Sequence, residues 1–193
     1  MEETATLPKH KYLLTYRFAE VIFDLTVEFC QDFLSDRDNL GHLRAIPTRR
    51  TIEQMTQAAR SGKQNIVEGV GQSETSKRGE IKLLGVAKAS FEELIADFED
   101  FLRQRRLPVF DKNNPKVQQF RQFGIEATKL KSPKLLRLPK DPETAANLLL
   151  TLCHQETYLL DRQIKALEEK FISEGGFTEN LFKRRLSYRK SLR

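Results

Sequence analysis

The chain has 193 residues, with 33 Lys and Arg against 27 Asp and Glu, which gives a formal net charge of +6. A hydrophobic fraction of 39% beside 31% charged residues is typical of a globular protein and excludes a disordered or membrane-embedded chain. We find no apolar run that could span a bilayer and no signal peptide. The two cysteines, Cys30 and Cys153, are too few for a disulfide framework, so we expect a reducing, cytoplasmic setting.

Four long stretches have apolar residues in steps of three and four, which places those side chains on one face of an α-helix. No useful length of chain alternates with a period of two, so strands are not expected. The sequence predicts an all-α fold, an antiparallel four-helix bundle over residues 12–173. The predicted helices cover about 12–37, 47–70, 76–106 and 142–173.

Local start and stop signals agree with these helices. Side-chain oxygens favour the first position of a helix, proline its first turn, and glycine the residue just after its end. We expect residues 69–73, Gly-Val-Gly-Gln-Ser, to separate the second helix from the third. Ser76 should cap the third helix, Asp141 and Pro142 should begin the fourth, and Gly175-Gly176 should end it.

The connection before the last long helix, residues 107–141, is unusually long and holds five of the seven prolines within 108–142. Loops of this length are uncommon unless they are functional or disordered. We expect a short helix at about 116–130 inside it. A second short helix, from Thr178 through Leu186, is expected in the C-terminal extension 174–193.

Basic charge gathers in two segments. The last eleven residues hold six basic side chains and no acid, and residues 112–140 hold eight against Glu126 alone. A mildly acidic body with two basic segments is typical of proteins that bind nucleic acid or another acidic surface, although such segments are often only solvated. The predicted contacts are Lys129, Lys131, Lys134 and Arg137 in the connection, with Lys183, Arg184, Arg185, Arg189 and Lys190 in the extension.

Catalytic patterns are missing from the sequence. The three histidines are scattered, and neither cysteine has a base partner within its own predicted helix. The Gly62-Lys63 pair lies inside a predicted helix with no strand before it, which is not a phosphate-binding loop. We therefore expect no catalytic residue, no metal site, no cofactor and no enzymatic activity.

Two runs resemble the signatures of a known family. They are Gln57-Ala58-Ala59-Arg60-Ser61 followed by Asn65-Ile66-Val67-Glu68-Gly69, and Ala87-Lys88-Ala89-Ser90-Phe91-Glu92-Glu93-Leu94. They resemble bacterial four-helix-bundle proteins encoded in intervening sequences of 23S ribosomal RNA genes. Gly62 and Ala89 depart from the family pattern. The long connection and the basic tail resemble the family's longer suffix-type variant.

The resemblance implies a non-enzymatic bundle that assembles as a homopentamer. It also implies a structural role for the signature residues Gln57, Ser61, Asn65, Glu68, Gly69, Ser90 and Glu93. A related protein, the accessory variability determinant of diversity-generating retroelements, binds a reverse transcriptase and nucleic acid through a basic surface.

Taken together, residues and resemblance lead to a specific expectation. The protein is an oligomer that binds RNA, DNA or a ribonucleoprotein partner through its basic segments, mainly by contacts with phosphates. The alternative is an adaptor whose partner is a protein, for example a retroelement reverse transcriptase. No membrane partner is expected.

Overall fold

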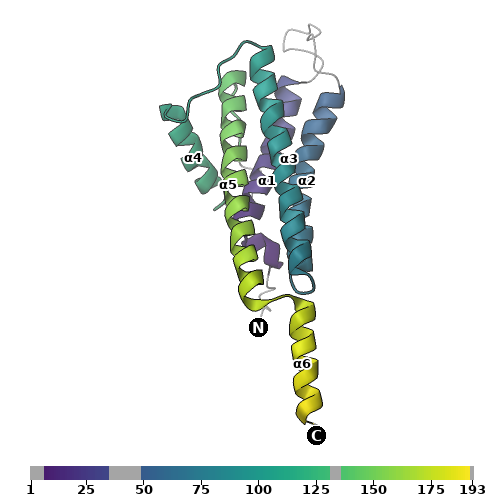
Figure 1. Ribbon diagram of the computed structural model, residues 1–193. Coiled ribbons are helices and arrows are strands. Elements are labelled where there is room, and N and C mark those ends of the chain that lie inside the picture. Colours follow the sequence, from purple (N-terminus) through teal and green to yellow (C-terminus); the bar gives the residue numbers. More distant parts are fainter. Residues whose placement is uncertain (1–6, 35–48, 131–135, 192–193) are drawn as a thin grey trace, which may run out of the picture.

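A computed structural model describes residues 7–34, 49–130 and 136–191, and every regular element in these ranges is a helix (Figure 1). The predicted all-α class is therefore confirmed. In chain order the elements are the 3₁₀ helix η1 (Lys9–Tyr12) and the α-helices α1 (Leu14–Phe33), α2 (Arg49–Gln72), α3 (Lys77–Gln104), α4 (Pro115–Ala127), α5 (Pro142–Glu174) and α6 (Phe177–Ser191).

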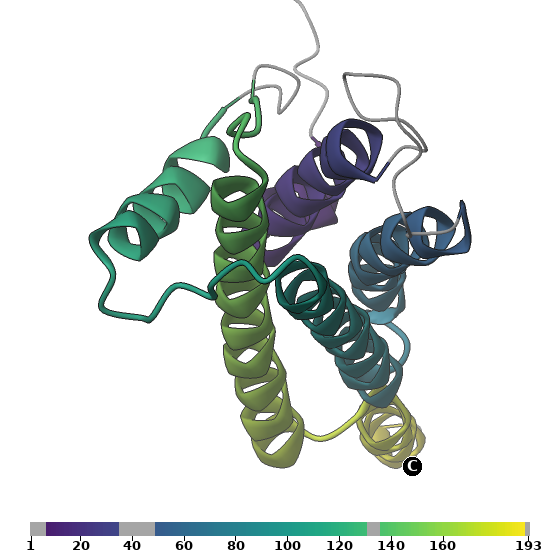
Figure 2. The same cartoon turned by 90° about the horizontal axis from the view of Figure 1, so that it is seen from above.

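Four helices enclose the core. Helices α1, α2, α3 and α5 contact one another in the cyclic order α1–α2–α3–α5, and α5 closes the circuit against α1 (Figures 1 and 2). Helix α4 lies outside this group, where it packs against α5 and α1. Helix α6 extends beyond the end of the group and lies apart from it (Figure 1).

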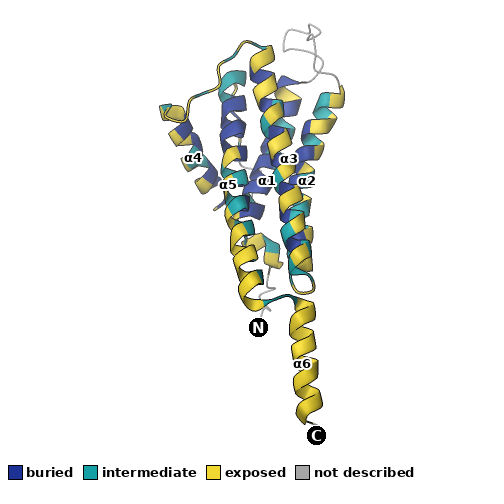
Figure 3. Cartoon of the chain, viewed as in Figure 1, coloured by how far each residue is buried: buried dark blue, intermediate teal, exposed yellow. Residues whose placement is uncertain are grey.

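Apolar stripes of the four helices face inward, as their periodicity predicts, while the outer faces are exposed (Figure 3). Phe29 of α1 lies fully buried, with its ring centroid 5.1 Å from that of Phe98 and 4.8 Å from that of Phe101, both on α3. Both pairs meet edge to face, the geometry that aromatic rings prefer. Burying each such side chain contributes about 1.5–3 kcal/mol to folding.

Small residues let α2 and α3 approach closely. A methyl group on Gly62 would come within 2.6 Å of the Phe91 ring, so the ring occupies the space that any larger residue would need. Glycine within a helix costs about 1 kcal/mol relative to alanine. The close packing against Phe91 offsets that cost.

The predicted helix starts are confirmed in atomic detail. The Ser76 hydroxyl accepts a hydrogen bond from the Gly79 backbone N–H at 3.0 Å, and the Asp141 carboxylate accepts one from Thr144 at 2.9 Å. Pro142 occupies the first turn of α5. The Asp141 bonds to Thr144 lower the pKa of the Asp141 carboxyl, because they stabilise its charged form.

The predicted break at residues 69–73 begins later than expected, because α2 continues through Gly69 and Gly71 to Gln72. Gly69 is buried against α3, where an added Cβ would lie 3.4 Å from the Glu80 carbonyl oxygen. Close packing explains this glycine better than a helix stop does. Parts of the first two predicted helices, 35–37 and 47–48, lie outside the described residues.

The long connection begins with a tight turn. Arg106 has φ +56°, the Leu107 N–H donates to the Leu102 carbonyl at 2.9 Å, and the Arg106 N–H donates to Arg103 at 3.1 Å. This pair of bonds is a Schellman motif, in which glycine is the usual residue at positive φ. The short helix predicted at 116–130 is α4, and the predicted terminal helix is α6, which is longer than the expected 178–186.

Candidate nucleic-acid interface

A two-glycine break separates α6 from the rest of the chain. Helix α5 ends at Glu174, and Gly175 adopts φ +74°, which glycine reaches without a Cβ clash. The Gly176 N–H donates to the Glu179 carboxylate at 3.1 Å, which places an acid at the N-terminal end of α6 where the helix dipole favours it. The stop predicted at Gly175-Gly176 is confirmed.

Every residue of α6 is exposed (Figure 3). None of its basic side chains forms an ion pair with any residue that the structure describes, so their charges face solvent. Five basic side chains accompany one acid, Glu179. They are Lys183, Arg184, Arg185, Arg189 and Lys190.

Helix α6 also carries large apolar side chains that are exposed. Phe177, Leu181, Phe182 and Tyr188 are between 48% and 65% exposed. They do not share one face, since Phe182 lies about 140° around the helix from Phe177 by the 100° turn per residue. An isolated helix of this length is at the lower limit of stability in water, so α6 would gain order from a bound partner.

The basic residues of the connection have a different setting. Lys129 is exposed and forms an ion pair with Glu126 at 2.8 Å, one turn earlier along the chain. Arg137 is exposed, and its guanidinium donates to the Leu136 carbonyl at 3.0 Å. Lys131 and Lys134 lie outside the described residues. The positive charge of Lys129 is therefore partly neutralised, unlike that of α6.

The two basic segments, which the sequence groups into one interface, lie apart. Helix α4 flanks α5 towards the end where α5 begins, whereas α6 follows the end where α5 stops (Figure 1). Gly124 of α4 lies against Leu152 and Gln155 of α5, and the 20 residues from Gln155 to the end of α5 at Glu174 span about 30 Å at 1.5 Å per residue. This distance greatly exceeds the Debye length of about 8 Å at physiological salt, so the segments act as separate charges.

Three of the signature residues form a hydrogen-bonded contact between α2 and α3. The hydroxyls of Ser61 and Ser90 are hydrogen-bonded at 3.1 Å, and the Asn65 amide donates to the Ser61 carbonyl at 2.9 Å and to its hydroxyl at 3.2 Å. The Ser61–Ser90 bond joins α2 to α3 beside Gly62, while the Asn65 bonds to Ser61 lie within α2. The structure thus gives Ser61, Asn65 and Ser90 packing roles.

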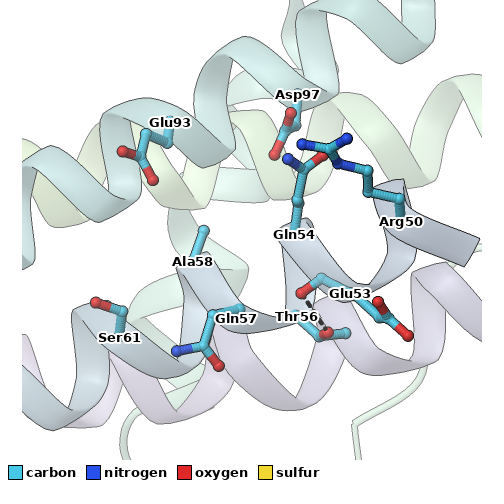
Figure 4. Close-up of a pocket in the computed structure, with 9 residues that line it drawn as sticks. All are labelled: Arg50, Glu53, Gln54, Thr56, Gln57, Ala58, Ser61, Glu93 and Asp97. Atoms are coloured by element: carbon cyan, nitrogen blue, oxygen red, sulfur yellow. Dashed lines mark hydrogen bonds between the residues drawn. The ribbon is translucent and has the colours of Figure 1, made fainter.

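The other polar signature residues, Gln57, Glu68 and Glu93, are exposed and form no hydrogen bond with any described residue. Gln57 and Glu93 border a hollow of about 860 Å³ between α2 and α3 (Figure 4). Asp97 also lines it, and half-burial raises the pKa of its carboxyl, with Asp100 and Glu93 adding to the shift. An acidic hollow repels phosphates, so this face does not suit nucleic acid.

The buried reactive groups are poor catalysts. Burial raises the pKa of the Cys30 thiol to about 12 and that of Cys153 well above its usual range, so both stay protonated and weakly nucleophilic. Within the described residues no three His, Cys, Asp or Glu side chains are grouped to hold a metal ion.

Glu156 is a buried residue that the sequence reasoning missed. Its carboxyl is fully buried in α5, both oxygens lack a hydrogen-bond partner among the described residues, and burial raises its pKa well above the usual range. The signal was present: Glu156 falls between Cys153 and Leu160 in the stepped apolar row of that helix. An acidic residue inside an otherwise apolar helical row is the sequence signal of a buried carboxyl.

No helix in the described ranges is both long enough and apolar enough to cross a membrane. No protein-family model, curated protein or solved structure matches the chain. The fold and the candidate site define the class of protein instead: an all-helical body that carries an exposed, strongly basic terminal helix.

Proposed function

We propose that this protein is a non-enzymatic, oligomeric helical bundle that binds RNA or a ribonucleoprotein partner through the basic side chains of α6. The observation that carries the proposal is the exposure of five unpaired basic side chains on a helix that projects from the body (Figure 1). Phosphates are the dense, regularly spaced anions that such a helix suits. The binding would be insensitive to nucleotide sequence.

The proposal includes an antiparallel four-helix bundle made of α1, α2, α3 and α5. Its support is the closed circuit of contacts among these helices and the match of their apolar stripes to the core. It also includes the homopentamer that the family resemblance implies and a cytoplasmic setting, in which free thiols such as Cys30 and Cys153 persist. Light scattering after size exclusion tests the pentamer, and a monomer at high concentration would count against it.

Salt dependence tests the nucleic-acid interface. If the five basic side chains of α6 each neutralise a phosphate on single-stranded RNA, affinity should fall by about a hundredfold between 50 and 200 mM salt. The variant with Lys183, Arg184, Arg185, Arg189 and Lys190 changed to Gln should lose most of this slope. The control changes five exposed basic side chains of the body, Arg60, Lys82, Arg103, Arg162 and Lys165, to Gln.

Fluorescence anisotropy with a labelled RNA of about 20 nucleotides measures both variants. The α6 variant should bind at least tenfold more weakly at 100 mM salt, while the control should stay close to the unmodified protein. Equal weakening in the two variants would mean that total charge, and not α6, governs binding.

A protein partner is the second candidate, and the exposed apolar side chains of α6 favour it. Phe177, Leu181 and Phe182 contribute nothing to phosphate contacts, yet they are the side chains that protein interfaces bury. A retroelement reverse transcriptase is one such partner by resemblance. A pull-down that survives nuclease treatment and fails when Leu181 and Phe182 are changed to Ser would favour the adaptor.

A further inference from the structure

A second hollow, of about 530 Å³, lies between α4, α5 and the connection that leads from α3 to α4. It is separate from the acidic hollow of Figure 4 and from α6. Cavities of roughly 300–1,000 Å³ are the usual size of small-molecule sites. The size, walls and charges of this hollow together indicate what it would hold.

The walls of the hollow are fixed by hydrogen bonds. Asn147 of α5 accepts the Phe110 N–H at 2.7 Å and donates to the Pro108 carbonyl at 3.0 Å, which ties the connection across α5. The Thr151 hydroxyl donates to the Asn147 carbonyl at 2.8 Å. The Gln155 amide donates to the Arg121 carbonyl at 3.3 Å, which ties α4 to α5. The hollow is thus formed before any ligand arrives.

Its interior is largely apolar. Val117 and Leu150 are buried in its floor. Val109 and Tyr158 also line it, yet they remain 53% and 60% exposed, so the hollow holds apolar surface that the chain itself does not cover. A ligand with an apolar body would bury this surface at a gain of about 25 cal/mol per Å².

The charge around the hollow has one sign. Lys112 and Arg121 line it together with His154, and no Asp or Glu is among its lining residues. Neither Lys112 nor Arg121 has an ion-pair partner within the part of the chain that the structure describes. Arginine presents a planar fork of N–H donors that matches the oxygens of a carboxylate or a phosphate.

From these observations we propose that the hollow binds a small organic anion: an apolar body against Val109, Val117, Leu150 and Tyr158, with its carboxylate or phosphate at Lys112 and Arg121. The site is independent of the nucleic-acid interface proposed for α6. Its ligand needs both parts, because the apolar body fills the floor and the anion neutralises the two basic side chains.

Competition against a fluorescent probe tests the proposal. The probe is 8-anilinonaphthalene-1-sulfonate, an apolar anion, titrated into the full chain at pH 7. Octanoate and octyl phosphate, the two anion types, should displace it. Octanol and octylammonium at the same concentration should displace it at least tenfold less well. The stronger of the two anions identifies the headgroup.

Variants locate the site. Changing Lys112 and Arg121 to Gln should weaken probe binding at least tenfold. The control pair, Lys82→Gln with Arg103→Gln, makes the same change in net charge at exposed positions elsewhere and should alter it less than twofold. Unchanged far-ultraviolet circular dichroism and melting temperature would show that both variants fold.

Chemical-shift mapping with octanoate provides a second readout, and the shifted amides should cluster at 109–121 and 147–158. Scattered shifts, equal displacement by octanol, or equal binding by the two variants would overturn the proposal. So would displacement of the probe by RNA but not by octanoate, since the hollow would then belong to a nucleic-acid surface.

Discussion

Replacing Glu156 with glutamine should change how the stability of this protein depends on pH. The carboxyl of Glu156 is fully buried, neither oxygen has a hydrogen-bond partner within the described part of the chain, and burial raises its pKa well above the usual range. In the unfolded chain the same group has a pKa of about 4.3. Glutamine keeps the size and shape of the side chain but does not ionise.

The sign follows from proton binding. Below the unfolded pKa, Glu156 is protonated in both states and contributes nothing to the pH dependence. At higher pH the unfolded chain loses this proton while the folded chain keeps it, so rising pH favours unfolding. The free energy of unfolding should fall by about 1.4 kcal/mol per pH unit from this group, until pH reaches its folded pKa.

The measurement is urea denaturation followed by circular dichroism at pH 5, 6 and 7. Relative to the unmodified protein, the free energy of unfolding of the Glu156→Gln variant should rise by about 1.4 kcal/mol per pH unit, over the pH range where the folded Glu156 carboxyl stays protonated. An unpaired glutamine amide shifts the whole curve but leaves its slope unaffected. The control is Glu168→Gln, an exposed position of the same helix. Parallel curves for Glu156→Gln and the unmodified protein would refute the reasoning.

Two further predictions concern backbone positions, and urea denaturation measures both. Gly62→Ala should lower the free energy of unfolding by about 1–3 kcal/mol, because its Cβ would meet the Phe91 ring, whereas Gly85→Ala, with open space around it, should raise it by up to about 1 kcal/mol. Equal effects at the two glycines would disprove the close-packing argument. Arg106→Gly should raise the free energy of unfolding by about 0.5–1 kcal/mol, because Arg106 has φ +56° and glycine removes the strain at some cost in chain entropy. A loss of stability would contradict the strain at this turn.

The sequence predicts the four long helices well because each buries one apolar face, and a buried helical face appears in the sequence as apolar residues three or four positions apart. Ser76 and Asp141 were readable as caps because capping depends on local geometry alone. The end of the second helix was placed too early at Gly69 because glycine both ends helices and permits close helix packing. Only the position of α3, which Gly69 packs against, distinguishes the two roles.

The candidate site was predictable in composition but not in arrangement. Charge counts identified the basic extension, yet nothing in the sequence gave the distance between Lys129 and α6. The hollow beside α5 needed the tertiary contact between Asn147 and Phe110, residues 37 positions apart. Such a contact leaves no periodic trace in the sequence.

The break at Gly175-Gly176 divides the chain into two parts that share little buried surface. Amide protons of α6 should therefore exchange with solvent long before those of α3 or α5, and proteases should cut near the break while the body stays intact. The terminal helix can be altered, removed or transferred to another protein without disturbing the packing of the core.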